Sequence, residues 1–138
     1  LHQFTCTAFD RTINRIVGRL DIDKGIAGTV RAGDEIIGGM GIVEGDLGYA
    51  FGPSAWGKGY ATEISRRLVS YVMHCYDWPQ LTAEAYADNP ASARVLEKIG
   101  FEEIGIALVP CAARGCEVDA RKFVLTRERW DALRNTSR

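Results

Sequence analysis

The spacing of apolar residues in the first half of the 138-residue chain predicts one helix followed by a hairpin region. Apolar side chains recur at helical spacing, which predicts an amphipathic helix over about residues 5–20. Three β-type runs follow at residues 26–31, 35–43 and 47–51, and Gly-containing turns separate them. Such turns between strands are typical of antiparallel hairpins. Three glycines in the middle run indicate a bulge or a close backbone approach there.

Residues 60–76 show the clearest helical pattern in the chain. Its apolar side holds Ala61, Ile64, Ser65, Leu68, Val69, Val72, Met73 and Cys75. Charged and polar residues occupy the opposite side, which is typical of a helix packed on a sheet. Strict alternation over residues 80–86 then predicts a strand.

The second half of the chain continues with a helix that has clear start and stop signals. Asn89 is a favourable N-cap, Pro90 suits the first helical position, and Gly100 suits the left-handed residue after the last turn at Ile99. We expect two further strands near residues 101–109 and 121–126, joined by a loop with Gly and Arg. Thr126 is expected to cap a closing helix that carries Trp130 and Leu133.

The order of these elements predicts an α+β fold with a mixed, mostly antiparallel sheet and helices on both faces. Composition agrees, because 46% hydrophobic and 25% charged residues suit one globular domain over residues 1–138. The net charge of −1 gives no general attraction to nucleic acid or to an anionic membrane. The first residues have no secretory pattern, and Leu1 is not a start methionine, so we expect the numbering to begin inside a longer gene product.

The four cysteines match no metal-binding spacing and no disulfide framework. We therefore interpret them as reduced thiols of a cytoplasmic protein and predict no metal site. The alternative is a redox-active pair formed by Cys111 and Cys116, which lie close together in the chain.

The segment Gly52-Pro-Ser-Ala-Trp-Gly-Lys-Gly-Tyr-Ala-Thr62 lies between a predicted strand and the strongest predicted helix. A helix N-terminus presents unpaired N–H groups and a partial positive charge. Glycines allow a phosphate to approach those amides closely. This turn therefore predicts a binding site for an anionic diphosphate.

Two phosphate-binding motifs compete for this segment. The Walker A loop is matched by Gly52, Gly57 and Lys58, but Gly59 stands where that loop needs a Ser or Thr hydroxyl for Mg²⁺. A nucleoside triphosphatase is thus the weaker alternative.

The other motif is the Q/R-x-x-G-x-G/A turn of the GCN5-related N-acetyltransferases. Trp56-Gly57-Lys58-Gly59-Tyr60-Ala61 matches its glycines, although Trp56 is not the first-position Gln or Arg. The segment 89–101 then resembles the N-x-x-S-x-x-x-L-x-K-x-G-F helix of the same superfamily. This form is typical of the branch that resembles the ribosomal-protein N-terminal acetyltransferases (RimJ/RimL-like). The resemblance covers about residues 26–126, and it leaves the first strand of the family pattern unidentified, so the chain looks short at its N-terminus.

The resemblance implies that acetyl-CoA is the co-substrate and lies between strands 47–51 and 80–86. Backbone N–H groups near Ala50 and Phe51 would stabilise the developing oxyanion. The cofactor-binding residues that it implies are Ala50, Phe51, Trp56, Gly57, Lys58, Gly59, Tyr60, Ala61, Thr62, Asn89 and Ser92.

The resemblance also implies direct attack of a primary amine on the thioester, which calls for a base and for an acid at the leaving thiolate. Many members of the superfamily use a tyrosine as the acid, at the position where this chain has Leu96. In the matching branch the serine of N-x-x-S is the proposed acid, which points to Ser92. Glu84 is the candidate base, and Glu117 and Asp119 are further candidates.

The acceptor implied by the resemblance is a primary amine, either a small molecule or a protein N-terminus, and the resemblance also implies a homodimer. A different class of function stays open, namely a catalytically silent acyl-CoA-binding regulatory module. Acceptor choice depends on loops, which the fold does not determine.

Overall fold

The computed structural model describes the backbone of residues 2–4, 13–21, 25–32, 35–51, 57, 59–111 and 113–136. Contacts divide the chain into two compact units, Leu1–Asp77 and Trp78–Arg138. Each unit combines an antiparallel sheet with helix, so the predicted α+β class is confirmed.

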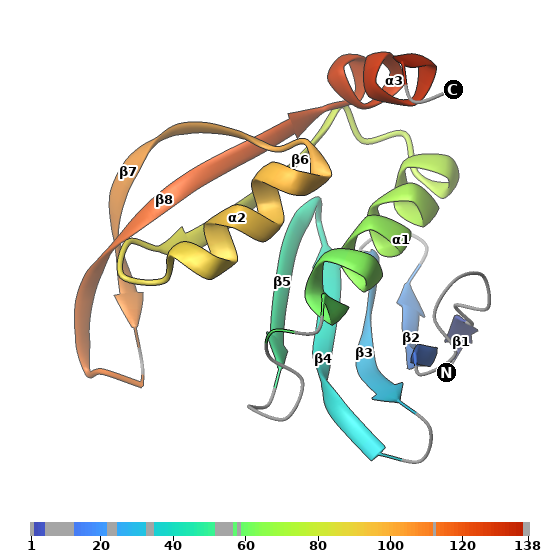
Figure 1. The fold of residues 1–138 in the computed structure, drawn as a ribbon, viewed down its shortest axis with the longest axis horizontal. Helices are drawn as coiled ribbons and strands as arrows, with labels where there is room; N and C mark the ends of the chain where they lie inside the picture. Colours follow the sequence, from blue (N-terminus) through green and yellow to red (C-terminus); the bar gives the residue numbers. More distant parts are fainter. Residues whose placement is uncertain are drawn as a thin grey trace. The chain divides into compact units, whose positions relative to one another are not determined.

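The first unit is an antiparallel sheet with one described helix lying across it (Figure 1). The strands are hydrogen-bonded in chain order. Their bounds are β1 His2–Phe4, β2 Ile13–Asp21, β3 Gly25–Ala32, β4 Glu35–Val43 and β5 Asp46–Phe51, and the helix is α1 Tyr60–Cys75. The three predicted hairpin strands and the predicted helix over 60–76 are therefore confirmed within two residues.

The core of the first unit lies between α1 and β4. Helix α1 buries the side that the apolar pattern indicated, at Ile64, Ser65, Leu68, Val69, Val72 and Met73. The Ser65 hydroxyl reaches the sulfur of Met40 on β4 at 3.9 Å. A bulge shifts the pairing of β4 with β3 between Val30 and Arg31, and Val30 then pairs with Gly38. The irregularity that the strand glycines indicated is thus present.

The predicted helix over residues 5–20 is wrong for its second half. Residues 13–21 form β2, which pairs with β3 from Ile13 to Asp21; residues 5–12 lie outside the described part of the chain. The β-branched residues Ile13, Ile16 and Val17 favour a strand once a partner strand is available. A further strand, β1, pairs with β2 where the sequence indicated none, since three residues are too few to show a pattern.

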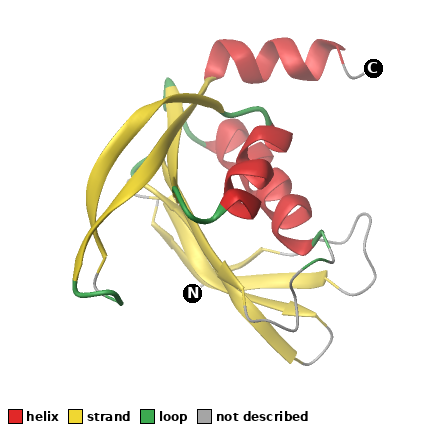
Figure 2. Cartoon of the chain, turned by 60° about the vertical axis from the view of Figure 1, so that its left-hand side comes forward, coloured by secondary structure: helices red, strands yellow, loops and turns green. Residues whose placement is uncertain are grey.

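The second unit contains a three-stranded antiparallel sheet in the order β6, β8, β7, with β8 in the middle. Its elements are β6 Gln80–Tyr86, α2 Pro90–Ile99, β7 Glu102–Cys111, β8 Cys116–Thr126 and α3 Arg127–Thr136. Figures 1 and 2 show β7 and β8 as a long twisted hairpin. Helix α2 contacts β6, and the shared core holds Leu81, Ala83, Leu96, Phe123 and Leu125.

Strand β8 begins five residues earlier than the sequence predicted. Residues 116–120, which include Glu117 and Asp119, were expected in the loop between the two strands. In the structure these residues extend the hairpin by pairing with the end of β7. Their backbone groups are satisfied by the ladder, and the charged side chains are exposed, so the pairing costs little.

The ends of α2 and α3 follow the predicted capping chemistry. The Asn89 side-chain oxygen accepts from the Ser92 N–H at 3.2 Å, and Gly100 ends α2 with a φ of 121°. The Phe101 N–H donates to the Leu96 carbonyl at 3.0 Å, which closes the last turn. Thr126 caps α3 by accepting from the Arg129 N–H at 3.2 Å.

Gly100→Ala should lower the free energy of unfolding by about 2 kcal/mol, because the site is both strained and crowded. The φ of +121° disfavours any L side chain, and an added Cβ would lie 2.5 Å from Leu133 Cδ1. Urea unfolding measures the change. The control is Gly48→Ala, whose Cβ would meet nothing within 4 Å. Equal stability of the two variants would contradict this account of the α2 end.

Candidate cofactor and active site

Two glycines shape the entry to α1. Gly57 and Gly59 have φ values of +74° and +77°, and a Cβ added at either would meet nothing within 4 Å. Both positions therefore combine a left-handed backbone with open space, which is what the close approach of a ligand needs. Trp56 and Lys58, also predicted to bind the cofactor, lie outside the described residues.

Gly59 is the N-cap of α1, and glycine has no side chain with which to cap the helix. Tyr60, Ala61 and Thr62 form the first turn of α1, and the N–H groups of a first turn point toward the N-terminal end of the helix. The ladder begins with the Glu63 N–H, which donates to the Gly59 carbonyl at 3.0 Å. These amides and the helix dipole give this end a partial positive charge that attracts an anion.

Ala50 and Phe51 lie at the end of β5, immediately before that turn. They pair with Gly39 and Gly38 of β4, and Ala50 is exposed. In the first unit, α1 thus follows β5 along the chain, as the strand-to-helix pattern predicted.

In the second unit, Asn89 and Ser92 meet at the N-terminus of α2. Besides its capping bond, Asn89 donates its own N–H to the Tyr86 carbonyl at 2.8 Å. This bond ties the start of α2 to the end of β6. Ser92 is half-buried in the first turn of the helix. The geometry explains Asn89 as a structural cap, and a role for either residue toward a cofactor stays a prediction.

Glu84, the candidate base, forms an ion pair across the sheet. Its Oε2 lies 2.6 Å from Lys122 Nζ, and the two side chains are 38% and 41% exposed. Lys122 stands opposite Glu84 in the register of β6 and β8. The Glu84 carboxylate is therefore already engaged by a cation from the neighbouring strand. The other candidates, Glu117 and Asp119, lie elsewhere in this unit, beside a pocket.

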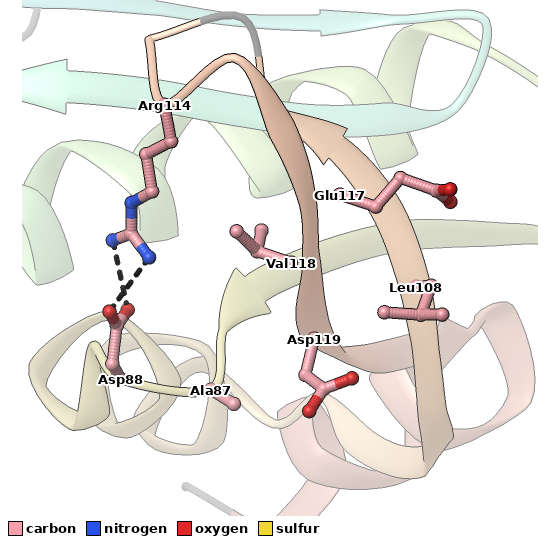
Figure 3. A pocket seen from close by; sticks show the side chains of 7 residues that line it. All are labelled: Ala87, Asp88, Leu108, Arg114, Glu117, Val118 and Asp119. Carbon is pink, nitrogen blue, oxygen red and sulfur yellow. Dashed lines mark hydrogen bonds and ion pairs between the residues drawn. The ribbon is translucent and has the colours of Figure 1, made fainter.

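That pocket, of about 360 Å³, is open at the side of the β7–β8 hairpin (Figure 3). Its lining residues are Ala87, Asp88, Leu108, Arg114, Glu117, Val118 and Asp119. Figure 3 shows the Arg114 guanidinium facing the Asp88 carboxylate through two contacts, at 2.8 and 3.2 Å. Hydrogen bonding from Arg114 lowers the pKa of Asp88 below its usual value.

Arg114 lies in the loop that was expected between the last two strands, and no sequence pattern indicated Asp88 as its partner. In the structure Arg114 also stacks over the Tyr86 ring, 5.4 Å from its centroid. The loop and the end of β6 are distant in the chain, so no spacing signal could have predicted this contact.

Comparison with known proteins decides the family of this chain. The family described as the acetyltransferase (GNAT) domain matches residues 3–102, which is more than half of the chain. The chain belongs to the GNAT acetyltransferase family. The glycine turn and both the β5 and α1 elements that flank it lie inside the matched region.

Curated relatives of this GNAT chain include two Bacillus proteins named as N-acetyltransferases. YoaA of Bacillus subtilis is 29% identical over 84 residues, which cover 61% of this chain and 48% of YoaA. The p20 protein of Bacillus licheniformis is 26% identical over 108 residues, or 73% of this chain and 61% of p20. The chain thus spans between about half and three fifths of the length of these relatives.

Solved structures share the GNAT fold. A spermidine N-acetyltransferase from Vibrio cholerae, solved in complex with CoA and spermine, superposes with a TM-score of 0.68 at 18% identity. The match covers 78% of this chain and 69% of the other. At this identity the likeness shows the fold.

In addition, none of the described helices is long and apolar enough to cross a membrane.

Proposed function

We propose that this GNAT chain is an acetyl-CoA-dependent N-acetyltransferase that moves an acetyl group directly to a primary amine. The observation that supports this most strongly is the pair of left-handed glycines at the start of α1. Gly57 and Gly59 leave open space beside the amides at the start of α1. A diphosphate is the part of acetyl-CoA that such a turn accommodates.

In this proposal the chain binds the co-substrate through backbone groups. N–H groups of Tyr60, Ala61 and Thr62 hold the diphosphate, with Trp56 and Lys58 assisting from the turn. The backbone near Ala50 and Phe51 stabilises negative charge on the thioester oxygen as the amine attacks. Asn89 contacts the co-substrate in addition to capping α2. No metal takes part.

Ser92 is the proposed general acid, because its hydroxyl lies in the first turn of α2 and can supply a proton to the leaving thiolate. An alkyl amine has a pKa near about 10.4, so it must lose a proton before it attacks. Glu84 is the proposed base. Glu84 is already in an ion pair with Lys122. The proposal therefore includes a water molecule that passes the proton from the amine to Glu84.

The acceptor in this proposal is a small-molecule amine or a protein N-terminus, and the protein acts in the cytoplasm. The solved relatives named as spermidine N-acetyltransferases support a small-molecule amine. The Asn89-to-Phe101 segment supports the branch that resembles the ribosomal-protein N-terminal acetyltransferases. The two classes of acceptor therefore belong in one test.

That test follows CoA thiol release from acetyl-CoA with a panel of polyamines, other small amines and peptides with free N-termini. We expect release that depends on one class of amine, with the acetylated amine identified by mass spectrometry. Spermidine-like amines serve as one matched control. Peptides that differ from the test peptides only in a blocked N-terminus serve as the other. Acetyl-CoA binding without turnover on any amine would instead favour a silent acyl-CoA-binding module.

A further inference from the structure

Two cysteines face each other at the far end of the β7–β8 hairpin. Cys111 is the last residue of β7, Cys116 is the first of β8, and the two are direct partners in the antiparallel register. Both are free thiols in this structure. Directly paired residues of an antiparallel ladder carry their side chains on the same side of the sheet.

The backbone spacing of this pair suits a disulfide. Opposite residues of an antiparallel ladder have Cα atoms about 4.5 or about 5.5 Å apart, depending on the kind of pair. A disulfide takes Cα separations of about 4.4–6.8 Å. Either kind of pair therefore allows the bond without moving the strands.

The two thiols differ in ways that suit consecutive steps of thiol–disulfide exchange. Cys116 is exposed, so an external disulfide can reach it, whereas Cys111 is 5% exposed. The Tyr86 hydroxyl hydrogen-bonds to the Cys111 sulfur and, together with the Arg114 N–H, lowers the pKa of Cys111 against the opposing effect of burial. The Arg114 guanidinium adds a favourable charge. The thiol with the lowered pKa, Cys111, is therefore paired in the ladder with the exposed thiol, Cys116.

We propose that Cys111 and Cys116 form a reversible dithiol–disulfide site that reacts with small disulfides such as oxidised glutathione. The Cys116 thiolate attacks the glutathione disulfide, which releases one glutathione and leaves a mixed disulfide on Cys116. The Cys111 thiolate then attacks the Cys116 sulfur and expels the second glutathione. One glutathione disulfide is thus reduced to two thiols, and the two protein thiols are oxidised to one disulfide.

This site is independent of acetyl transfer, but it adjoins the pocket of Figure 3. Arg114 lies in the turn that closes the hairpin, and the Arg114 N–H donates to the Cys111 carbonyl at 3.1 Å. Arg114 in turn holds Asp88. Oxidation converts the Cys111 thiol, which hydrogen-bonds with Tyr86, into a disulfide sulfur, and Tyr86 is the residue over whose ring Arg114 stacks.

The test uses the full chain in a Cys6→Ser/Cys75→Ser background, where only the pair remains. After treatment with oxidised glutathione, we expect a mass lower by two hydrogens and the loss of both free thiols. Trypsin cuts after Arg114, between the two cysteines, so peptides 99–114 and 115–121 should stay joined until dithiothreitol separates them. The Cys111→Ser variant in this background should stop at a glutathione adduct on Cys116.

Two results would overturn the proposal. One is a stable glutathione adduct on Cys116 in the presence of Cys111, which would show that the buried thiolate does not complete the exchange. The other is two unmodified thiols under conditions that convert a cysteine peptide of sequence 115–121. The peptide lacks the hairpin, so it reports the reactivity of an exposed thiol alone.

Discussion

Gly59→Trp is expected to weaken acetyl-CoA binding by at least about 100-fold. Gly59 is the N-cap of α1, and its missing side chain leaves open space beside the first-turn amides. An indole there would occupy the volume that the proposed site gives to the diphosphate. Loss of two charge-assisted hydrogen bonds at about 1.5–3 kcal/mol each accounts for the size of the effect. Titration calorimetry of both proteins measures it.

The matched control is Gly115→Trp in the β7–β8 turn. Gly115 has a φ of +66°, and its added Cβ would also meet nothing within 4 Å. The two variants therefore carry a similar backbone cost and the same new side chain. We expect Gly115→Trp to bind acetyl-CoA as the wild type does. Equal affinities for the two variants would place the diphosphate somewhere other than the start of α1.

Ser92→Ala is expected to lower kcat by about 100-fold, the lower end of what a positioned proton donor contributes. The substitution removes the hydroxyl but keeps the backbone N–H that donates to Asn89. The helix cap therefore survives, and the variant should fold as the wild type does. Steady-state kinetics across pH, with the best amine from the panel, provides the measurement.

Ser92→Thr serves as the comparison, because it keeps a hydroxyl at the same position of α2. It should recover part of the lost kcat, while a merely structural serine would show no such difference between Ala and Thr. Full kcat for Ser92→Ala at every pH would remove Ser92 from the role of acid. Proton transfer to the leaving thiolate would then have to come from water.

Local signals predicted the elements that carry their own start and stop chemistry. Helix α2 was predicted from Asn89, Pro90 and Gly100 alone, and its observed bounds agree. Strand β6 was likewise predicted at its observed bounds, because its alternation continues through all seven residues. In both cases the residues that determine the element are neighbours in the chain.

The wrong predictions concern segments that become strands because they pair with a partner strand. The apolar spacing in residues 13–20 fits a helix, but pairing with β3 makes this segment a strand. Residues 116–120 became strand through their register with β7. Pairing of this kind depends on contacts between segments, which a window along one segment does not contain.

The same difference between local signals and long-range contacts applies to the candidate site. The left-handed Gly57 and Gly59 were indicated by a local motif between a strand and a helix. By contrast, the contact of Arg114 with Asp88 and the ion pair of Glu84 with Lys122 join residues far apart in the chain. These contacts determine which carboxylates are already paired, and they form only when the second unit folds.

The central claim is that this GNAT chain binds acetyl-CoA at the start of α1, and calorimetric titration of the wild-type chain tests it most directly. The account predicts saturable one-to-one binding of acetyl-CoA, competition by CoA, and no heat with Mg·ATP at the same concentrations. Binding of Mg·ATP but not of acetyl-CoA by the folded protein would contradict the account and favour the Walker-type interpretation of the same glycine turn.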